Sequence, residues 1–297
     1  KAPELMAIEN WINSEPLKIE SLRGKVILVD FWTYTCINCI RTLPYLKEWH
    51  NKYKDKGLVI IGVHTPEFEF EKEYKNVLKA VNEYGIKYPV AQDNYYATWL
   101  AYKNRFWPHK FLIDSDGYIR YDKVGEGDYS KTEAVIKSLI KEKNEKMNEQ
   151  SFIDSSISKP DDAQSVNFQN IGTPEIYFGY QFSRGNFGNP EGIRGGEIVD
   201  YKLPSAIQKN NVYLEGKWQA NADNMELFGD EGSILLKFQA KTISFVAGAN
   251  NESKAMIMLD NKPHNKQLNL QEFKLYTLAT AQDYGEHEIR INVKGKG

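Results

Sequence analysis

The hydrophobic pattern of this chain of 297 residues changes once, near residue 145. Before that point, continuous apolar runs alternate with segments of helical period. The run "KVILVDFW" (25–32) is typical of a strand that is buried on both faces, and a second such run, "GLVIIGVH", covers residues 57–64. A segment of helical period follows over residues 71–85. This alternation predicts an α/β domain, a mixed sheet flanked by helices, over residues 1–145.

The pattern after residue 145 is of another kind. Residues 146–170 are polar and have no sustained period, so we expect a linker there. From about residue 197 the period becomes two, in about eight short runs that are separated by turn residues. We therefore expect an all-β domain, a sandwich or jelly roll, over residues 171–297.

Composition argues against several classes of protein. The chain has 38 basic and 40 acidic residues and a net charge of −2, which gives no electrostatic reason to expect a nucleic-acid partner. No apolar run reaches the length of a membrane span, and the polar opening "KAPELMAIENW" is not a signal peptide. Because the first residue is Lys rather than Met, we expect a fragment from which a targeting segment has been removed.

The only two cysteines, Cys36 and Cys39, lie directly after the first buried run and before a segment of helical period. Structural zinc usually takes four ligands, and the five histidines have no H-x₃₋₅-H spacing, so we expect neither a metal nor another cofactor. At a helix N-terminus, the dipole and the free N–H groups stabilise a thiolate. A structural disulfide or two idle thiols is the alternative, but the strand–helix setting favours redox chemistry.

Other residues near the cysteines are candidates for the same site. Asp30 lies inside an apolar run, where burial raises the pKa of a carboxyl, and it could accept a proton from Cys39. Trp32, Tyr34 and Trp107 are candidates for a substrate-binding surface, although aromatic residues are more often part of a core. For His64 and Glu67, in "GVHTPEF", we expect a structural role.

The segment "FWTYTCINCIRTLPYL" resembles the thioredoxin superfamily, and within its TlpA-like branch it is most similar to the thioredoxin-like domain of the DipZ family. Asp30 matches the buried carboxylate of these proteins, Pro44 the proline in the active-site helix, and Pro108 the cis-proline that faces the dithiol. The resemblance covers about residues 1–143. A weaker one continues through "GTPEIYFGY" into the carbohydrate-binding-module-like C-terminal domain of that family, which adds a further strand, so we expect the sandwich to be clipped at Gly297.

This resemblance implies an extracytoplasmic thiol–disulfide oxidoreductase, in the periplasm or at the cell surface and tethered to a membrane in the full-length protein. Cys36 would attack a disulfide and Cys39 would resolve the mixed disulfide, with Asp30 and Pro108 as further catalytic residues. The implied partners are disulfide-bonded exported proteins and a membrane electron-donor domain or protein of the DsbD/CcdA type. The dipeptide Ile37-Asn38 carries no cation, which favours a reductant or isomerase over a strong oxidant.

Two other functions stay open. The β-rich half could bind a glycan or a protein while the redox domain is accessory; four aromatic residues are candidates for a sugar-stacking platform, namely Tyr201, Tyr213, Trp218 and Phe228. Residues 33–36 also satisfy the T-x-x-C motif of thiol peroxidases. Those enzymes need a proline four residues before the threonine, where this chain has Val29.

Overall fold

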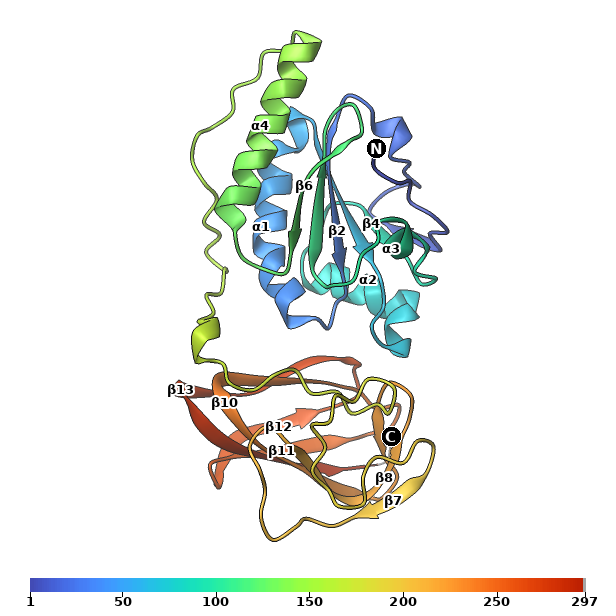
Figure 1. Cartoon of the computed structure of the whole chain (residues 1–297), viewed down its shortest axis with the longest axis vertical. Coiled ribbons are helices and arrows are strands. Elements are labelled where there is room, and N and C mark those ends of the chain that lie inside the picture. Colours follow the sequence, from blue (N-terminus) through green and yellow to red (C-terminus); the bar gives the residue numbers. More distant parts are fainter. Residues whose placement is uncertain (296–297) are drawn as a thin grey trace. The chain divides into compact units, whose positions relative to one another are not determined.

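The structure of the chain is a computed structural model, which describes residues 1–295 apart from the side chains at positions 265 and 266. It divides into two compact units, the first ending at Ser165 and the second beginning at Val166 (Figure 1). The expected end of the second domain, Gly297, lies outside the described residues. Within residues 1–295, no helix has both the length and the apolar composition needed to cross a membrane.

The first unit is built on a mixed sheet, as predicted. Its strands are β1 (Asn10–Ile12), β2 (Val26–Trp32), β3 (Leu58–His64), β4 (Val90–Gln92), β5 (His109–Ile113) and β6 (Ile119–Val124). Their order is β1-β4-β3-β2-β5-β6. The β2–β3 and β3–β4 pairs are parallel, whereas β1, β5 and β6 pair antiparallel with their neighbours. The α/β class of this domain is therefore confirmed.

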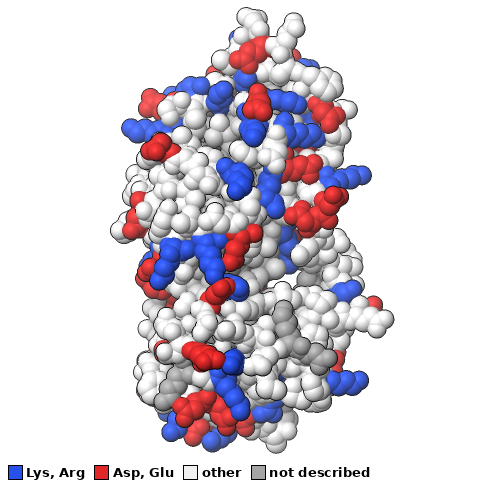
Figure 2. Space-filling model, turned by 180° about the vertical axis from the view of Figure 1, so that it is seen from behind, with Lys and Arg blue, Asp and Glu red and all other residues white. Residues whose placement is uncertain are grey.

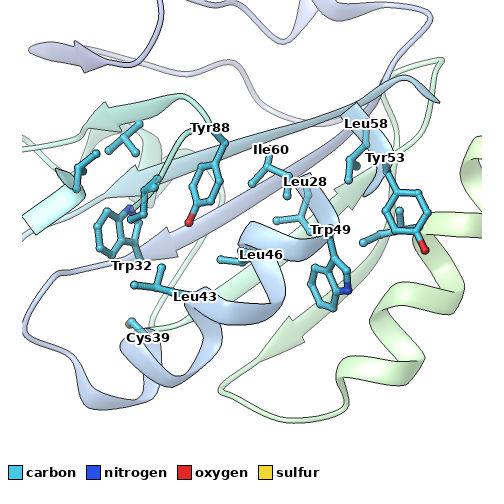
Figure 3. Close-up of a cluster of buried hydrophobic side chains, with 14 of the residues drawn as sticks. Leu28, Trp32, Cys39, Leu43, Leu46, Trp49, Tyr53, Leu58, Ile60 and Tyr88 are labelled. Carbon is cyan, nitrogen blue, oxygen red and sulfur yellow. The ribbon is translucent and has the colours of Figure 1, made fainter. Parts of the chain in front are cut away.

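Helices cover both faces of this sheet, which explains why the central runs are continuously apolar. The helices are α1 (Ile37–Tyr53), α2 (Tyr74–Glu83), α3 (Ala97–Ala101) and α4 (Tyr129–Met147), with short 3₁₀ turns η1 (Glu20–Leu22), η2 (Lys54–Lys56) and η3 (Glu69–Lys72). Leu28 and Trp32 of β2 belong to one buried cluster with residues of α1, α2 and α4 (Figure 3). Ile27 and Val29 belong to another, with residues of α3. Because side chains alternate along a strand, Asp30 points to the face that α1 covers.

The second unit is all-β, as predicted. After the 3₁₀ turn η4 (Phe168–Asn170), its strands are β7 (Ile198–Tyr201), β8 (Val212–Ala220), β9 (Met225–Leu227), β10 (Glu231–Ala247), β11 (Lys254–Leu259), β12 (Lys262–Asn269) and β13 (Lys274–Lys294). Their order is β12-β11-β13-β10-β8-β7, and β9 pairs with β8. Hydrogen bonds connect these seven strands in one sheet, which does not by itself make the two-sheet arrangement of a jelly roll.

Two pairs of short strands that the sequence predicts are in fact continuous. The period-two pattern is interrupted near residues 241 and 283, but both positions lie inside long strands, β10 and β13, which pair with each other along most of their length. Ala240 pairs with Gly285 and Thr242 pairs with Thr280, so the register skips residue 241 and residues 281–284. This register shift, and a second one between Ile243 and Ser244, absorb the irregularity while both strands continue.

The segment for which the sequence predicts a linker, residues 146–170, contains the boundary between the two units. Residues up to Ser165 belong to the first unit, because α4 extends to Met147 and the following segment is held against it. The carboxylate of Glu133, which is fully buried, accepts hydrogen bonds from the backbone N–H and the hydroxyl of Ser158, at 2.7 and 2.9 Å. A polar composition therefore marks a surface segment here, not a free tether.

Acidic and basic side chains are interspersed on the face of the molecule that Figure 2 shows. Among the charged side chains of the first unit, some are paired at the surface, as in the Lys72–Glu69 and Arg120–Glu142 contacts. The face in Figure 2 therefore presents mixed charge, in line with the nearly neutral composition.

Candidate active site

The two cysteines lie at the point where β2 gives way to α1. Cys36 is the N-cap residue of α1, and its sulfur accepts a hydrogen bond from the backbone N–H of Cys39 at 3.1 Å. The two residues form a disulfide, with 5.2 Å between their Cα atoms. The helix N-terminus thus points its free N–H groups at the first sulfur, which is the setting that stabilises a thiolate once the disulfide is reduced.

The two sulfur-bearing residues differ in accessibility. Cys36 is half-buried, whereas Cys39 is 1% exposed and packs in the core beneath α1 with Leu43 and Leu46 (Figure 3). Pro44 lies one turn further along the same helix. A disulfide from outside can therefore approach Cys36, while Cys39 is positioned to act only within the molecule.

Asp30 forms a buried ion pair with a residue that the sequence did not single out. Asp30 on β2 lies opposite Lys110 on β5 in the sheet register, and both side chains are 1% exposed. The Lys110 Nζ is 3.8 Å from the Asp30 carboxylate, and within residues 1–295 Asp30 Oδ1 has no hydrogen-bond partner. Lysine is seldom fully buried without a partner, and here the partner is supplied by the neighbouring strand.

Burial and the ion pair act in opposite directions on this carboxyl. Burial raises the pKa of Asp30 from 3.8 to about 6, and the charge of Lys110 opposes the rise. Burial likewise lowers the pKa of Lys110, which the charge of Asp30 counteracts. A carboxyl with a pKa near 6 is mostly ionised at neutral pH, and it can take up a proton without a large cost.

The peptide bond between Trp107 and Pro108 is cis, as the sequence predicted. The Pro108 carbonyl accepts a hydrogen bond from the N–H of Gly125 at 2.7 Å. Trp107 is half-buried; its indole N–H donates to the carbonyl of Thr65 at 3.0 Å, and its ring lies 4.3 Å from that of Trp99. Whether Pro108 takes part in catalysis stays a prediction.

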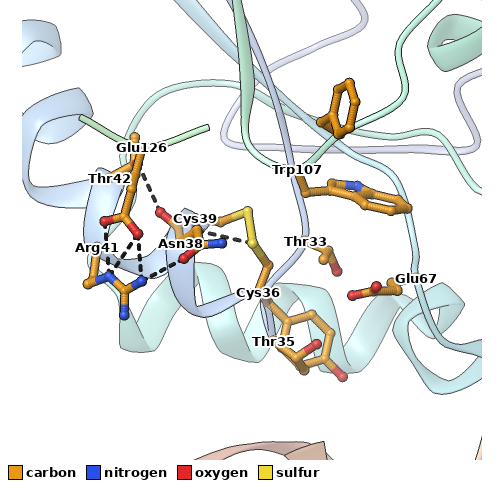
Figure 4. The surroundings of a disulfide bond; sticks show 12 residues. Thr33, Thr35, Cys36, Asn38, Cys39, Arg41, Thr42, Glu67, Trp107 and Glu126 are labelled. Carbon is orange, nitrogen blue, oxygen red and sulfur yellow. Dashed lines mark hydrogen bonds and ion pairs between the residues drawn. A yellow bond between two sulfur atoms is a disulfide. The ribbon is translucent and has the colours of Figure 1, made fainter. Parts of the chain in front are cut away.

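Two of the three predicted substrate-binding aromatics do not face solvent. Trp32 is fully buried and Tyr34 is 2% exposed, because both lie under the helices that cover the sheet. The ring of Tyr34 stacks on buried His64 at 5.7 Å, and Trp32 contacts the same imidazole edge-on. Of the three, only Trp107 offers part of its surface beside the dithiol (Figure 4).

Glu71 is a buried group that sequence reasoning missed. It lies in η3, after β3, and it accepts a hydrogen bond from the hydroxyl of Thr35 at 2.5 Å. Its other oxygen accepts from the backbone N–H groups of Glu67 and Phe68, at 2.6 and 3.0 Å. Burial raises the pKa of Glu71, and these hydrogen bonds counteract the rise. In the run "EFEFEKE" nothing separates Glu71 from its exposed neighbours, so only the fold could identify it.

A second missed group adjoins the dipeptide between the cysteines. The Arg41 guanidinium donates from Nε to Glu126 at 3.0 Å, and its Nη2 donates both to Glu126 and to the side-chain oxygen of Asn38 at 2.5 Å. Figure 4 shows these three residues on one side of the disulfide, with Trp107 and Glu67 on the other. The dipeptide itself carries no cation, but a guanidinium contacts it from the next turn of α1.

In the second unit, the four aromatic candidates do not form a platform. Tyr201, Tyr213 and Trp218 are at most 4% exposed, whereas Phe228 is 50% exposed. Tyr201 and Trp218 belong to the buried cluster of this unit. Tyr213 lies outside that cluster but is also buried, and its hydroxyl accepts a hydrogen bond from the backbone N–H of Gln208 at 2.9 Å, so a sugar-stacking role of the four together is not supported by their placement.

Both halves of the chain match known protein families. Residues 11–140 match the family described as Redoxin, and residues 173–297 match the family described as the thioredoxin-like C-terminal domain. The protein DipZ of Mycobacterium tuberculosis is 39% identical over 265 residues, which cover 88% of this chain and 37% of DipZ. The chain therefore spans little more than a third of the length of that relative.

Shorter relatives match the first unit. The thiol–disulfide oxidoreductase ResA of Bacillus anthracis is 30% identical over 139 residues, which cover 47% of this chain and 76% of ResA. Among solved structures, a thiol–disulfide isomerase from Corynebacterium glutamicum is 28% identical, with a TM-score of 0.43, over 47% of this chain and 96% of that one.

Proposed function

Since this chain belongs to the thioredoxin-like family of thiol–disulfide oxidoreductases, we propose that its Cys36–Cys39 pair reduces or exchanges disulfides of exported proteins outside the cytoplasm. The observation that carries the proposal is the unequal placement of the two cysteines. Cys36 caps the helix and is accessible, whereas Cys39 is buried one turn further on.

The proposed cycle transfers two electrons from the dithiol to the substrate. The Cys36 thiolate attacks a substrate disulfide, forms a mixed disulfide and releases the first substrate thiolate. Cys39 then attacks the Cys36 sulfur, which restores the Cys36–Cys39 disulfide and releases the second substrate thiol. In this step Asp30, on the α1 face of β2, takes the proton of Cys39, directly or through water.

The oxidised pair needs an external dithiol to return to its reduced form. We assign this step to a membrane electron-donor domain or protein of the DsbD/CcdA type, with the protein tethered to the membrane outside the cytoplasm. The resemblance to DipZ supports this assignment, and so does the dipeptide Ile37-Asn38, which has no cation of its own to favour a strong oxidant.

The second unit is proposed to recognise or position a partner, a protein or a glycan, without taking part in the chemistry. Its support is that both cysteines lie in the first unit. Pro108 and Trp107 are proposed to line the path of an extended substrate beside Cys36.

The function is tested by reduction of insulin disulfides with dithiothreitol as the electron source. We expect the full chain to accelerate the reaction, Cys36→Ser to abolish the acceleration, and Cys39→Ser to accumulate mixed disulfides. Absence of turnover by the folded wild-type chain would contradict the proposal. Peroxide reduction in the same dithiothreitol assay would instead favour the peroxidase alternative.

A further inference from the structure

Arg41 and Glu126 form an ion pair that is shielded from solvent beside the dithiol. Their side chains are 12% and 10% exposed, and their contacts include two hydrogen bonds to Glu126 from Nε and one from Nη2. A pair with this geometry is more strongly coupled than an ordinary surface ion pair, because little water screens it and the guanidinium fork fits the carboxylate.

The pair is joined to the dipeptide between the cysteines. Nη2 of Arg41 also donates to the side chain of Asn38, whose backbone carbonyl accepts from the hydroxyl of Thr42 at 3.0 Å. In Figure 4 the guanidinium lies between the carboxylate of Glu126 and the amide of Asn38. The guanidinium of Arg41 is therefore hydrogen-bonded to a residue that lies between the two cysteines in the sequence.

Glu126 comes from a loop that contacts other parts of the site. The preceding residue, Gly125, donates its N–H to the carbonyl of Pro108, and its own carbonyl accepts from Lys110 at 3.5 Å. This loop thus adjoins the cis-proline, the buried Asp30–Lys110 pair and, through Glu126, the start of α1. Within this loop, the carboxylate of Glu126 is the negative charge that pairs with the Arg41 guanidinium.

We propose that Arg41 and Glu126 set the reduction potential of the Cys36–Cys39 pair, with Glu126 neutralising a guanidinium charge that would otherwise stabilise the reduced form. Two electrons and two protons convert the disulfide to two thiols, and one proton fewer is needed where Cys36 remains a thiolate. Only the reduced state carries that negative charge, so a nearby unpaired cation favours reduction and an unpaired anion opposes it.

This inference rests on the proposed thiol–disulfide chemistry, and its test is a set of variants of the full chain with opposite expected signs. Glu126→Gln leaves the Arg41 charge unbalanced, and we expect the pair to become more oxidising by about tenfold in its equilibrium with glutathione, ~30 mV for two electrons. Arg41→Met leaves the Glu126 charge unbalanced and should shift the equilibrium several-fold the other way. The double variant should return to within about twofold of the wild type.

Two further variants separate charge from packing. Arg41→Lys keeps the charge but not the fork, so the potential should stay within about twofold of the wild type, whereas a purely structural role would move it as far as Arg41→Met does. Glu142→Gln breaks the Arg120–Glu142 pair, which joins the start of β6 to the last part of α4, and should leave the potential unchanged.

The potential is measured by equilibrating each variant with glutathione buffers of known ratio and counting free thiols by alkylation and mass spectrometry. The proposal would be overturned if the potentials of Glu126→Gln and Arg41→Met shifted with the same sign, or if neither shifted. It would also be overturned if the potential of the double variant did not return to that of the wild type. Insulin reduction by the wild type is measured in parallel, because a wild type that fails there contradicts the proposed function whatever the potentials are.

Discussion

At the scale of single residues, the two cysteines have the same chemistry and different surroundings. Once the disulfide is reduced, iodoacetamide near neutral pH should modify Cys36 at least about tenfold faster than Cys39, because Cys36 caps the helix and Cys39 is 1% exposed. Peptide mapping by mass spectrometry measures both rates in one sample. Faster modification of Cys39 would reverse the assignment of attacking and resolving residues.

The raised pKa of Asp30 makes the free energy of unfolding depend on pH. Its pKa is about 6 in the folded chain against 3.8 in the reference state, so the folded state binds the proton more tightly. The associated stability is present below about pH 4 and is lost as pH rises through about 6; the full difference is about 3 kcal/mol, at 1.36 kcal/mol per pKa unit.

Urea unfolding at pH 5 and pH 7 tests this expectation. Wild type should lose more stability between these values than a variant in which Asp30→Asn is combined with Lys110→Met, which removes both buried charges together. The single Asp30→Asn change strands the charge of Lys110 and should show the opposite trend, because a buried lysine is less easily protonated at neutral pH. Equal pH dependence in all three proteins would show that Asp30 ionises normally.

At the scale of elements, the carboxylate of Glu71 joins η3 to the loop that precedes Cys36. Glu71→Ala should lower the free energy of unfolding by about 2–3 kcal/mol, since it leaves the hydroxyl of Thr35 and the N–H groups of Glu67 and Phe68 without their buried acceptor. The matched control is Glu69→Ala in the same 3₁₀ turn. Glu69 is exposed and forms a surface ion pair with Lys72, so its loss should change stability by less than about 0.5 kcal/mol.

Denaturant titration of both variants at one pH measures the difference. Similar small effects of the two changes would mean that η3 is held by its backbone and its aromatic contacts alone. A large effect of Glu71→Ala with insulin reduction retained would separate the anchoring of the loop from the chemistry of the dithiol.

At the scale of the whole chain, the first unit ends at Ser165, after the segment that packs on α4. A chain of residues 1–165 should fold and reduce insulin at a rate close to that of the full chain. A chain of residues 1–149 lacks Ser158 and leaves the buried carboxylate of Glu133 with fewer donors, so it should be less stable by about 1.5–3 kcal/mol.

The stabilities of the two truncated chains are compared by thermal and urea unfolding, and their activities by insulin turnover. Equal stabilities would show that residues 150–165 are a tether after all. A folded chain of residues 1–165 without activity would mean that the second unit supplies part of the active site.

The sequence alone determined what depends on local pattern. Alternating periods predicted an α/β domain followed by an all-β domain, and a continuous apolar run predicted that Asp30 is buried. The spacing of Cys36 and Cys39 between a strand and a helix predicted the disulfide and the helix cap, and the resemblance implied the cis bond before Pro108. Neighbouring residues specify these features, because a helix cap and the alternation of a strand each depend on only a few consecutive positions.

Only the tertiary structure decided which distant groups meet. Arg41 reaches Glu126 across 85 positions, Thr35 reaches Glu71 across 36, and Ser158 reaches Glu133 across 25. Each partner lies in a charged or polar run that reads as solvated surface, and each becomes a buried contact because sheet order and helix packing bring its element to the site. The same packing buries Trp32 and Tyr34. Whether an aromatic ring is exposed depends on the elements that pack over it, and neighbouring residues in the sequence do not specify these elements.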